Sequence, residues 1–390
     1  MQFTENYTFL KSIFNPSLDV NKIPGSNIEI RFCTFESPAD INPETEILQE
    51  LRRNLTGGAQ DQSILENHKF YYPVFCPAGK AKNNKAILML HGLNERKWDK
   101  YLSWAFYLAE QTGKSVILFP TSFHLNRGPE KWLNARELTK MVDERLSRFS
   151  NSTETCFANL TLSNRLTESP ERFFLSGLQT ANDITSLLKL INNGEHPSFE
   201  QNTKADVFAY SIGGLLAQVL MMENPEGLLS DSKLFLFCAG SVFEHMNGIS
   251  RCIMDSTANA RLHSYYELEF EDEIKRNGIL REFFNESKIG MAFRSMIAMN
   301  RYRNSRESTF NKINDKVYAI ALKEDKVIPA DKIYENLLGS AKNDKLKVDI
   351  LHFDYPYLHE MPFPVKLAGI ESKVNEAFNV IFGKAAAFLA

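Results

Sequence analysis

The stretch that most constrains this chain is residues 205–214, where a serine separates a short apolar run from a helical pattern. The apolar run ends just before Ser211, and the helical pattern covers residues 212–223. The sequence therefore predicts a strand, a one-residue turn and a helix. A turn this sharp requires small residues two positions before and two positions after the serine, and Ala209 and Gly213 meet that requirement.

The same turn has a chemical consequence. It holds the hydroxyl of Ser211 above the edge of a sheet and at the N-terminus of a helix, where the N–H of Ile212 and the helix dipole stabilise developing negative charge. The pattern is a variant of the G-x-S-x-G nucleophile elbow. A match of this kind arises by chance about 0.2–0.3 times in a chain of this length, and the alternative is a small-residue turn that only allows close packing.

A second stretch adds to this chemistry. Residues 87–90 form a short apolar run, followed by His91, Gly92 and Leu93 and then by an amphipathic helix expected over 98–111. Glycine permits a sharp turn at the strand end, so the N–H of Leu93 could point at a substrate oxyanion beside the N–H of the elbow. The alternative is an ordinary strand-to-helix turn.

A third stretch lies in the C-terminal third. Asp325 follows a strand expected over 317–322, and His359 stands in a loop after a strand expected over 346–353. A serine hydroxyl is a weak nucleophile, so an imidazole must take its proton and a carboxylate must orient that imidazole. His359 and Asp325 are the residues expected in these two roles.

Ser211, Asp325 and His359 each follow a strand, and in this order they resemble the α/β-hydrolase superfamily. The resemblance covers the chain from about residue 69 to its end. It implies a mostly parallel eight-stranded sheet flanked by helices, with Ser211 as nucleophile, His359 as general base and Asp325 as orienting acid. It also implies that Leu93 and Ile212 supply the oxyanion N–H groups.

The chain departs from the usual pattern at two points. Ala209 replaces the first glycine of the elbow, and no Gly-Gly pair precedes His359. Each role also has rivals, which are His352 and His91 for the base, Glu324, Asp354 and Glu244 for the acid, and Ser122 and Ser241 for the nucleophile.

The loop after the strand expected over 115–120 is a candidate for substrate contact. His124 and Arg127 lie on it and could bind an acidic or polar group, and Tyr210, next to the serine, is counted with them. Arg127 could equally anchor its own loop through carbonyl groups or through Glu130. A polar helix, expected over 129–149, follows this loop.

The chain divides into three expected parts. Residues 1–68 form an N-terminal extension that contains a first strand and a polar helix over 43–55. Residues 69–241 and 315–390 form the α/β-hydrolase core, and residues 242–314 form a helical insertion. An insertion here emerges at the strand ends beside the serine, so we expect it to be a cap over the site; the alternative is an addition that only stabilises the sheet edge.

Composition limits the class of partner. The formal net charge of −3 gives no basic surplus for nucleic acid, and no apolar run of about 18 residues is present to span a membrane. Five cysteines without paired spacing favour reduced thiols, and the N-terminus lacks a signal-peptide pattern, so a cytoplasmic location is expected unless a signal sequence was removed.

The sequence thus predicts a serine hydrolase that cleaves a small or medium acyl ester through a covalent acyl-enzyme. A small-molecule acyl substrate is the expected partner, and the mechanism needs no cofactor or metal. The alternatives are a peptidase or amidase, an acyltransferase, and a catalytically silent binding protein. A distance of more than about 6 Å between His359 and Ser211, with no rival histidine nearby, would favour the silent protein.

Overall fold

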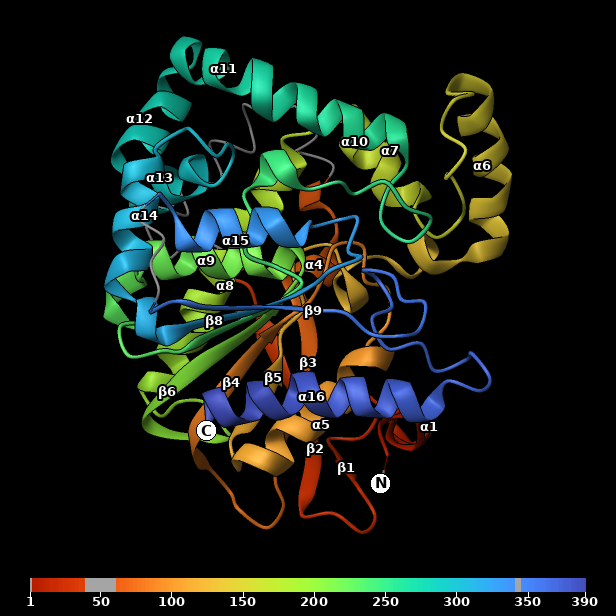
Figure 1. Cartoon of the computed structure of the whole chain (residues 1–390), viewed down its shortest axis with the longest axis vertical. Coiled ribbons are helices and arrows are strands. Elements are labelled where there is room, and N and C mark those ends of the chain that lie inside the picture. Colours follow the sequence, from red (N-terminus) through yellow and green to blue (C-terminus); the bar gives the residue numbers. More distant parts are fainter. Residues whose placement is uncertain (1, 39–60, 341–344) are drawn as a thin grey trace.

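In the described residues, nine strands form one sheet in the order β1-β2-β3-β5-β4-β6-β7-β8-β9. The structure is a computed structural model that describes residues 2–38, 61–340 and 345–390. The helix expected over 43–55 lies outside these residues. Figure 1 shows the sheet between two layers of helices, with further helices above one layer.

The strands read as apolar runs because most of them are buried on both faces. They are β1 (Val20–Lys22), β2 (Ile28–Glu36), β3 (Lys69–Pro77), β4 (Asn83–Leu90), β5 (Ser115–Leu118), β6 (Phe199–Tyr210), β7 (Leu234–Phe237), β8 (Val317–Leu322) and β9 (Lys347–Leu351). The pairs among β5, β4, β6, β7, β8 and β9 are parallel, whereas β1, β2, β3 and β5 pair antiparallel.

The expected fold class, α/β with a mostly parallel sheet flanked by helices, is confirmed. The sheet has nine strands where eight were expected. The additional strand, β1, is three residues long and pairs at the sheet edge through Val20–Lys22. So short a segment carries too few alternating positions for a sequence pattern to reveal it.

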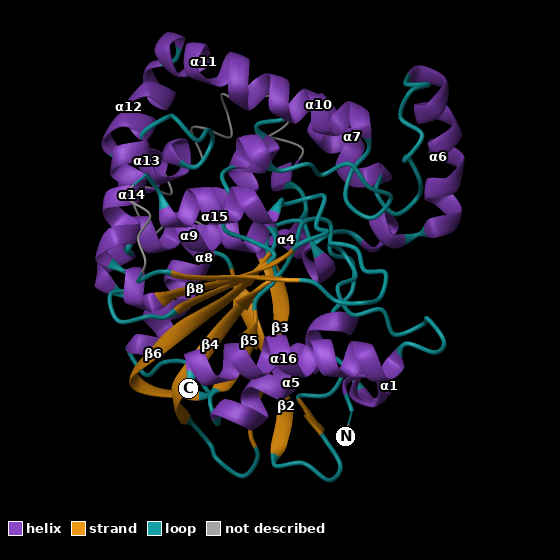
Figure 2. Cartoon of the chain, in the orientation of Figure 1, coloured by secondary structure: helices purple, strands orange, loops and turns teal. Residues whose placement is uncertain are grey.

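Two hydrophobic cores lie on the two faces of the sheet. Helices α1 (Phe3–Ile13), α5 (Asp99–Thr112) and α16 (Glu371–Leu389) cover one face, and α8 (Arg172–Asn192), α9 (Ile212–Glu223) and α15 (Ala330–Leu338) cover the other (Figure 2). The short helix α4 (Leu65–His68) precedes β3. In the described part of the chain, no helix combines the length and the apolarity that a bilayer crossing requires.

Two excursions leave the strand ends. The first carries α6 (Ala135–Arg148) and α7 (Leu160–Glu168), and the second carries α10 (Ser256–His263), α11 (Phe270–Arg276), α12 (Gly278–Glu286), α13 (Lys288–Ser295) and α14 (Arg303–Lys312). The helix expected over 129–149 is divided. Asn134 accepts hydrogen bonds from the N–H groups of Arg136 and Glu137, so it caps α6 and separates it from a 3₁₀ turn at Glu130–Leu133.

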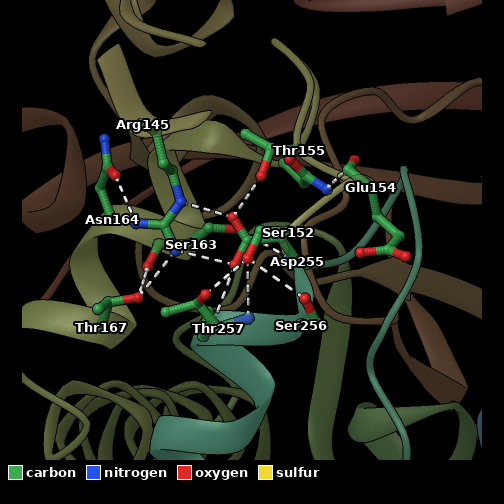
Figure 3. A network of polar contacts seen from close by, with 12 residues as sticks. Arg145, Ser152, Glu154, Thr155, Ser163, Asn164, Thr167, Asp255, Ser256 and Thr257 are labelled. Atoms are coloured by element: carbon green, nitrogen blue, oxygen red, sulfur yellow. Dashed lines mark hydrogen bonds and ion pairs between the residues drawn. The ribbon is translucent and has the colours of Figure 1, made fainter. Parts of the chain in front are cut away.

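A buried polar network ties the two excursions together (Figure 3). Arg145 of α6 donates to both carboxylate oxygens of Asp255, at 2.5 and 2.8 Å, and also to Asn164 and Thr167 of α7. Asp255 in turn caps α10 by accepting from the N–H of Ala258. Burial alone would raise the pKa of Asp255, but the hydrogen bonds from Arg145 and Ala258 outweigh it and lower that pKa.

Replacing Asp255 by alanine should therefore lower the free energy of unfolding by about 3–5 kcal/mol, because Arg145 is left buried without a counter-charge. Urea unfolding at 25 °C measures the change. The matched control is Lys275→Gln, which breaks the exposed Lys275–Asp272 pair and should cost far less than the Asp255 variant. An equal loss of unfolding free energy in the two variants would show that the buried pair stabilises the fold no more than an exposed pair does.

Candidate active site

Ser211 occupies the turn between β6 and α9, as the sequence predicts. Its backbone has φ 57° and ψ −127°, a left-handed region that L-residues rarely adopt. The side chain is buried, and the residue immediately precedes the first turn of α9, whose leading N–H groups have no partner within the helix. The backbone is therefore strained at the residue expected to be the nucleophile.

The glycines after the serine are required by close contacts. A Cβ atom on Gly213 would lie 2.7 Å from the carbonyl oxygen of His91 and 2.8 Å from that of Leu90. A Cβ atom on Gly214 would lie 2.4 Å from the Cβ of Ala239. From the sharp turn alone, position 213 would be expected to contact position 209. In the structure, the nearest atoms instead belong to the end of β4.

His359 and Asp325 meet at Ser211. The Nε2 atom of His359 lies 2.6 Å from Ser211 Oγ, and its Nδ1 atom lies 2.7 Å from Asp325 Oδ2. A carboxylate only accepts, so Nδ1 carries the proton and Nε2 accepts from the serine hydroxyl. The other carboxylate oxygen of Asp325 accepts from the N–H groups of Val327 and Ile328, both at 2.9 Å, which fixes its orientation. All three side chains are buried.

The rival residues have other partners. His352 lies 3.1 Å from the hydroxyl of Tyr357, Asp354 pairs with Lys373, and Glu244 accepts from the N–H of Met299. The rival serines are likewise engaged, since Ser122 accepts from Thr180 and Ser241 donates to the Val242 carbonyl.

The turn at the end of β4 lies against the serine. An ideal Cβ on Gly92 would be 3.3 Å from Ser211 Cβ, so this turn and the elbow are in contact. His91 pins the turn, because its Nδ1 donates to the Gly92 carbonyl and its Nε2 accepts from the N–H of Thr121. Burial lowers the pKa of His91 well below its usual value, which keeps the imidazole neutral in this role.

A network that the sequence did not reveal joins this turn to the histidine loop. The N–H of Gly92 donates to the hydroxyl of Tyr101, which donates to Glu95, and Glu95 pairs with Lys100. Lys100 also donates to the Glu360 carbonyl at 3.0 Å. Lys100 thus connects the turn after β4 with the loop that carries His359. No local sequence motif marks the residues of this network.

Tyr210 has a different place from the one expected. It was counted as substrate-binding, but its side chain is buried and its hydroxyl donates to the carbonyl of His359. The ammonium of Lys100 lies 4.7 Å from the centre of its ring. Tyr210 therefore holds the loop that carries His359, a role other than the substrate contact expected.

Arg127 is also structural. It is fully buried and pairs with Asp183 at 2.7 Å, while donating to the carbonyls of Pro120 and Asn67. These contacts give Arg127 a role other than the substrate contact expected. The alternative, that it anchors its loop through carbonyls, describes the structure, with Asp183 in the place considered for Glu130.

His124 lies beside the site and lines two adjoining cavities. Its Nδ1 lies 2.8 Å from the Ser122 carbonyl and must donate to it, which leaves Nε2 as an acceptor. Burial lowers the pKa of His124 to about 4, so the ring is neutral near pH 7. A neutral imidazole that presents an acceptor does not pair with a carboxylate. Of the two kinds of substrate group expected at His124, acidic or polar, this favours a polar group that donates a hydrogen bond.

An apolar cavity of about 80 Å³ lies beside the serine turn. Its walls include Leu93 and Ile212, the residues expected to supply oxyanion N–H groups, together with Phe173 of α8 and with Ile289 and Phe293 of α13. We call it the apolar cavity. It begins at the serine turn and lies under a helix of the second excursion.

The family comparison extends over the whole sequence. A family described as one of unknown function, DUF6051, matches residues 1–390. The chain belongs to the DUF6051 family. No curated protein matches the sequence.

Solved structures similar to this DUF6051 protein include two esterases. Carboxyl esterase 2 of the mycorrhizal fungus Tuber melanosporum is 9% identical with a TM-score of 0.48, over 94% of this chain and 87% of that one. The hyperthermophilic esterase of the archaeon Pyrobaculum calidifontis is 12% identical with a TM-score of 0.45, over 98% and 90% of the two chains.

One set of side chains in this DUF6051 protein has the composition of a metal site. Among the described residues, Cys238, Asp325 and His359 offer ligand atoms within 4.8 Å of one another. His359 directs Nδ1 at the carboxylate and Nε2 at Ser211, and burial, together with the nearby carboxylate of Asp325, raises the pKa of the Cys238 thiol well above its usual value. These groups satisfy one another, which is the arrangement of an oriented acid–base pair.

Gly213→Ala should lower the free energy of unfolding by at least about 2 kcal/mol, because its Cβ would enter the space of two carbonyl oxygens. Urea unfolding measures the loss. Gly383→Ala in α16 is the control: its nearest neighbour is Tyr107 Oη at 3.8 Å, so the helix should gain about 0.5–1 kcal/mol. A Gly213 variant as stable as the wild type would contradict the steric account of the elbow.

Proposed function

We propose that this DUF6051 protein is a serine hydrolase that cleaves a small or medium acyl ester through a covalent acyl-enzyme on Ser211. The observation that carries the proposal is the buried chain of hydrogen bonds from Ser211 Oγ through His359 to Asp325, at 2.6 and 2.7 Å. Such a chain activates a hydroxyl that is otherwise a weak nucleophile.

The proposed reaction has two halves. Ser211 Oγ attacks the ester carbonyl carbon while its proton passes to His359 Nε2, and Asp325 stabilises the resulting imidazolium. The tetrahedral intermediate collapses, the imidazolium gives its proton to the leaving alcohol, and the acyl group stays on the serine. Water then attacks the acyl-enzyme with His359 again as base, which releases the acid and restores the hydroxyl.

The oxyanion of both intermediates requires donors. We assign this role to the N–H groups of Leu93 and Ile212, because the first follows the turn that contacts Ser211 and the second begins α9. Each donor is worth about 3–4 kcal/mol of barrier in a water-excluded site. The hydrogen bonds of His91 and Tyr101 to the turn support this assignment, since they restrict its backbone.

The size of the acyl group follows from the apolar cavity. A volume of about 80 Å³ with apolar walls suits a short aliphatic chain. Because Ile289 and Phe293 line it from α13, we also propose that residues 242–314 act as a cap over the core formed by 69–241 and 315–390.

Hydrolysis of p-nitrophenyl esters of two to sixteen carbons tests the proposal. The wild type should cleave the shortest esters fastest. Ser211→Ala, His359→Gln and Asp325→Asn should each lower kcat by about 10⁴-fold, because each removes a member of one catalytic unit. Ser241→Ala, which alters a buried serine that also follows a strand, should keep kcat within about tenfold.

Two results would contradict parts of this proposal, one the nucleophile and the other the size of the acyl group. Full activity of the folded Ser211→Ala protein would exclude Ser211 as nucleophile. A preference for sixteen-carbon esters would leave the chemistry intact but contradict the size of the acyl site. Anilides of the same acyl groups, assayed in parallel, separate ester from amide cleavage.

A further inference from the structure

A second cavity adjoins the apolar one. It has a volume of about 60 Å³ and shares Leu93, His124 and Phe173 with the apolar cavity. Its other walls include Arg96 and Trp132, along with two further arginines. We call it the arginine cavity. Because both cavities meet at Leu93, a ligand bound at the serine can reach into either.

Two of the three arginines already have carboxylate partners. Arg165 donates to both oxygens of Asp61, at 2.9 and 3.0 Å. Arg172 donates to Asp61 at 3.1 Å and to Glu168 at 2.7 Å. Their charges are therefore balanced within the protein, and their donors point at these partners.

Arg96 differs from them. Within the part of the chain that the structure describes, its one hydrogen bond is to the Trp132 carbonyl at 3.3 Å, and its guanidinium lies 5.6 Å from the ring centre of Phe157. No carboxylate of the described residues pairs with it. Glu95, its neighbour in the sequence and in the cavity wall, is committed to Lys100 and Tyr101. A guanidinium has five N–H donors, so most of those on Arg96 remain available.

The surroundings of Arg96 make this charge costly without a ligand. The side chain is half-buried, and burial lowers its pKa; the thiol of Cys156 opposes this effect in part, and no described carboxylate pairs with the guanidinium. His124 on the shared wall is neutral and presents an acceptor, so it neither repels nor neutralises the guanidinium. The arginine cavity therefore carries one unbalanced positive charge close to the serine turn.

We propose that Arg96 binds a carboxylate of the substrate, so that the preferred ester carries an acidic group within reach of the arginine cavity. This inference rests on the proposed hydrolase function. A carboxylate suits the site because its two oxygens match the planar guanidinium fork, and a cavity of about 60 Å³ accepts so small a group. The simpler account is a solvated arginine that only covers Phe157, and it predicts no discrimination between charged and neutral ligands.

Binding of benzoate and of its neutral isostere benzamide, measured by isothermal titration calorimetry, tests the site without catalysis. Wild-type protein should bind benzoate at least about tenfold more tightly than benzamide, since a charge-assisted pair is formed only with the acid. Arg96→Gln should abolish that preference, and Arg96→Lys should keep part of it because the charge remains while the fork is lost. Arg136→Gln, which removes an exposed arginine of α6, should bind like the wild type.

Kinetics then connect the site to the reaction. The ratio of kcat/KM for 4-acetoxybenzoate to that for 4-acetoxybenzamide should be at least about ten in the wild type and near one in Arg96→Gln. A phenyl monoester of adipic acid and its carboxamide analogue test the same preference with the acid on the acyl side. Thermal unfolding of each variant shows whether it is folded.

The outcomes separate the two proposals. Equal binding of benzoate and benzamide to the wild type, or a preference that survives in Arg96→Gln, overturns the carboxylate site. Ser211-dependent cleavage of the neutral esters would then still support the hydrolase. Conversely, benzoate binding that depends on Arg96, in a protein that cleaves none of these esters, supports the carboxylate site and rejects the hydrolase.

Discussion

The approach of Gly213 to the end of β4 is the contact on which the site depends. With Leu90 and His91 carbonyl oxygens within 2.8 Å of where a side chain would begin, α9 can only start here if this position is glycine. The contact holds the first turn of α9 against β4, directly after the strained backbone of Ser211. It also brings the Gly92 turn against the serine. Parallel pairing of β4 with β6 thus positions both the proposed nucleophile and the proposed oxyanion donors.

Polar contacts then hold the loops around this fixed point. Lys100 connects the turn after β4 to the histidine loop through Glu95 and the Glu360 carbonyl, and Tyr210 holds the same loop from β6. Further out, the Arg145–Asp255 pair joins the excursion that carries α6 and α7 to the one that carries α10 to α14 (Figure 3). The second excursion supplies α13, whose side chains line the apolar cavity. The buried pair at the periphery therefore helps to define the shape of the candidate substrate site.

Much of this arrangement follows from local sequence order. Strand, serine, glycine and helix are adjacent in the chain, and strands precede Asp325 and His359, so their meeting at one sheet edge could be predicted. Contacts between distant segments could not. Arg127 was expected at the substrate, yet Asp183, 56 positions away, makes it a buried anchor. The contacts of Lys100 join residues that are far apart in the sequence. The unbalanced charge of Arg96 likewise depends on which carboxylates the fold brings near it. The strand β1 could not be predicted because three residues are too few to show an alternating pattern.

The central claim is that His359 activates Ser211, and covalent capture by a fluorophosphonate tests it most directly. Such reagents react with serines whose hydroxyl is deprotonated by a neighbouring base. Intact-mass measurement followed by peptide mapping should find one adduct per chain, on Ser211, and none on the folded His359→Gln protein. An adduct on another serine, or no adduct on a folded wild type that admits small fluorophosphonates to the cavity, would contradict the account.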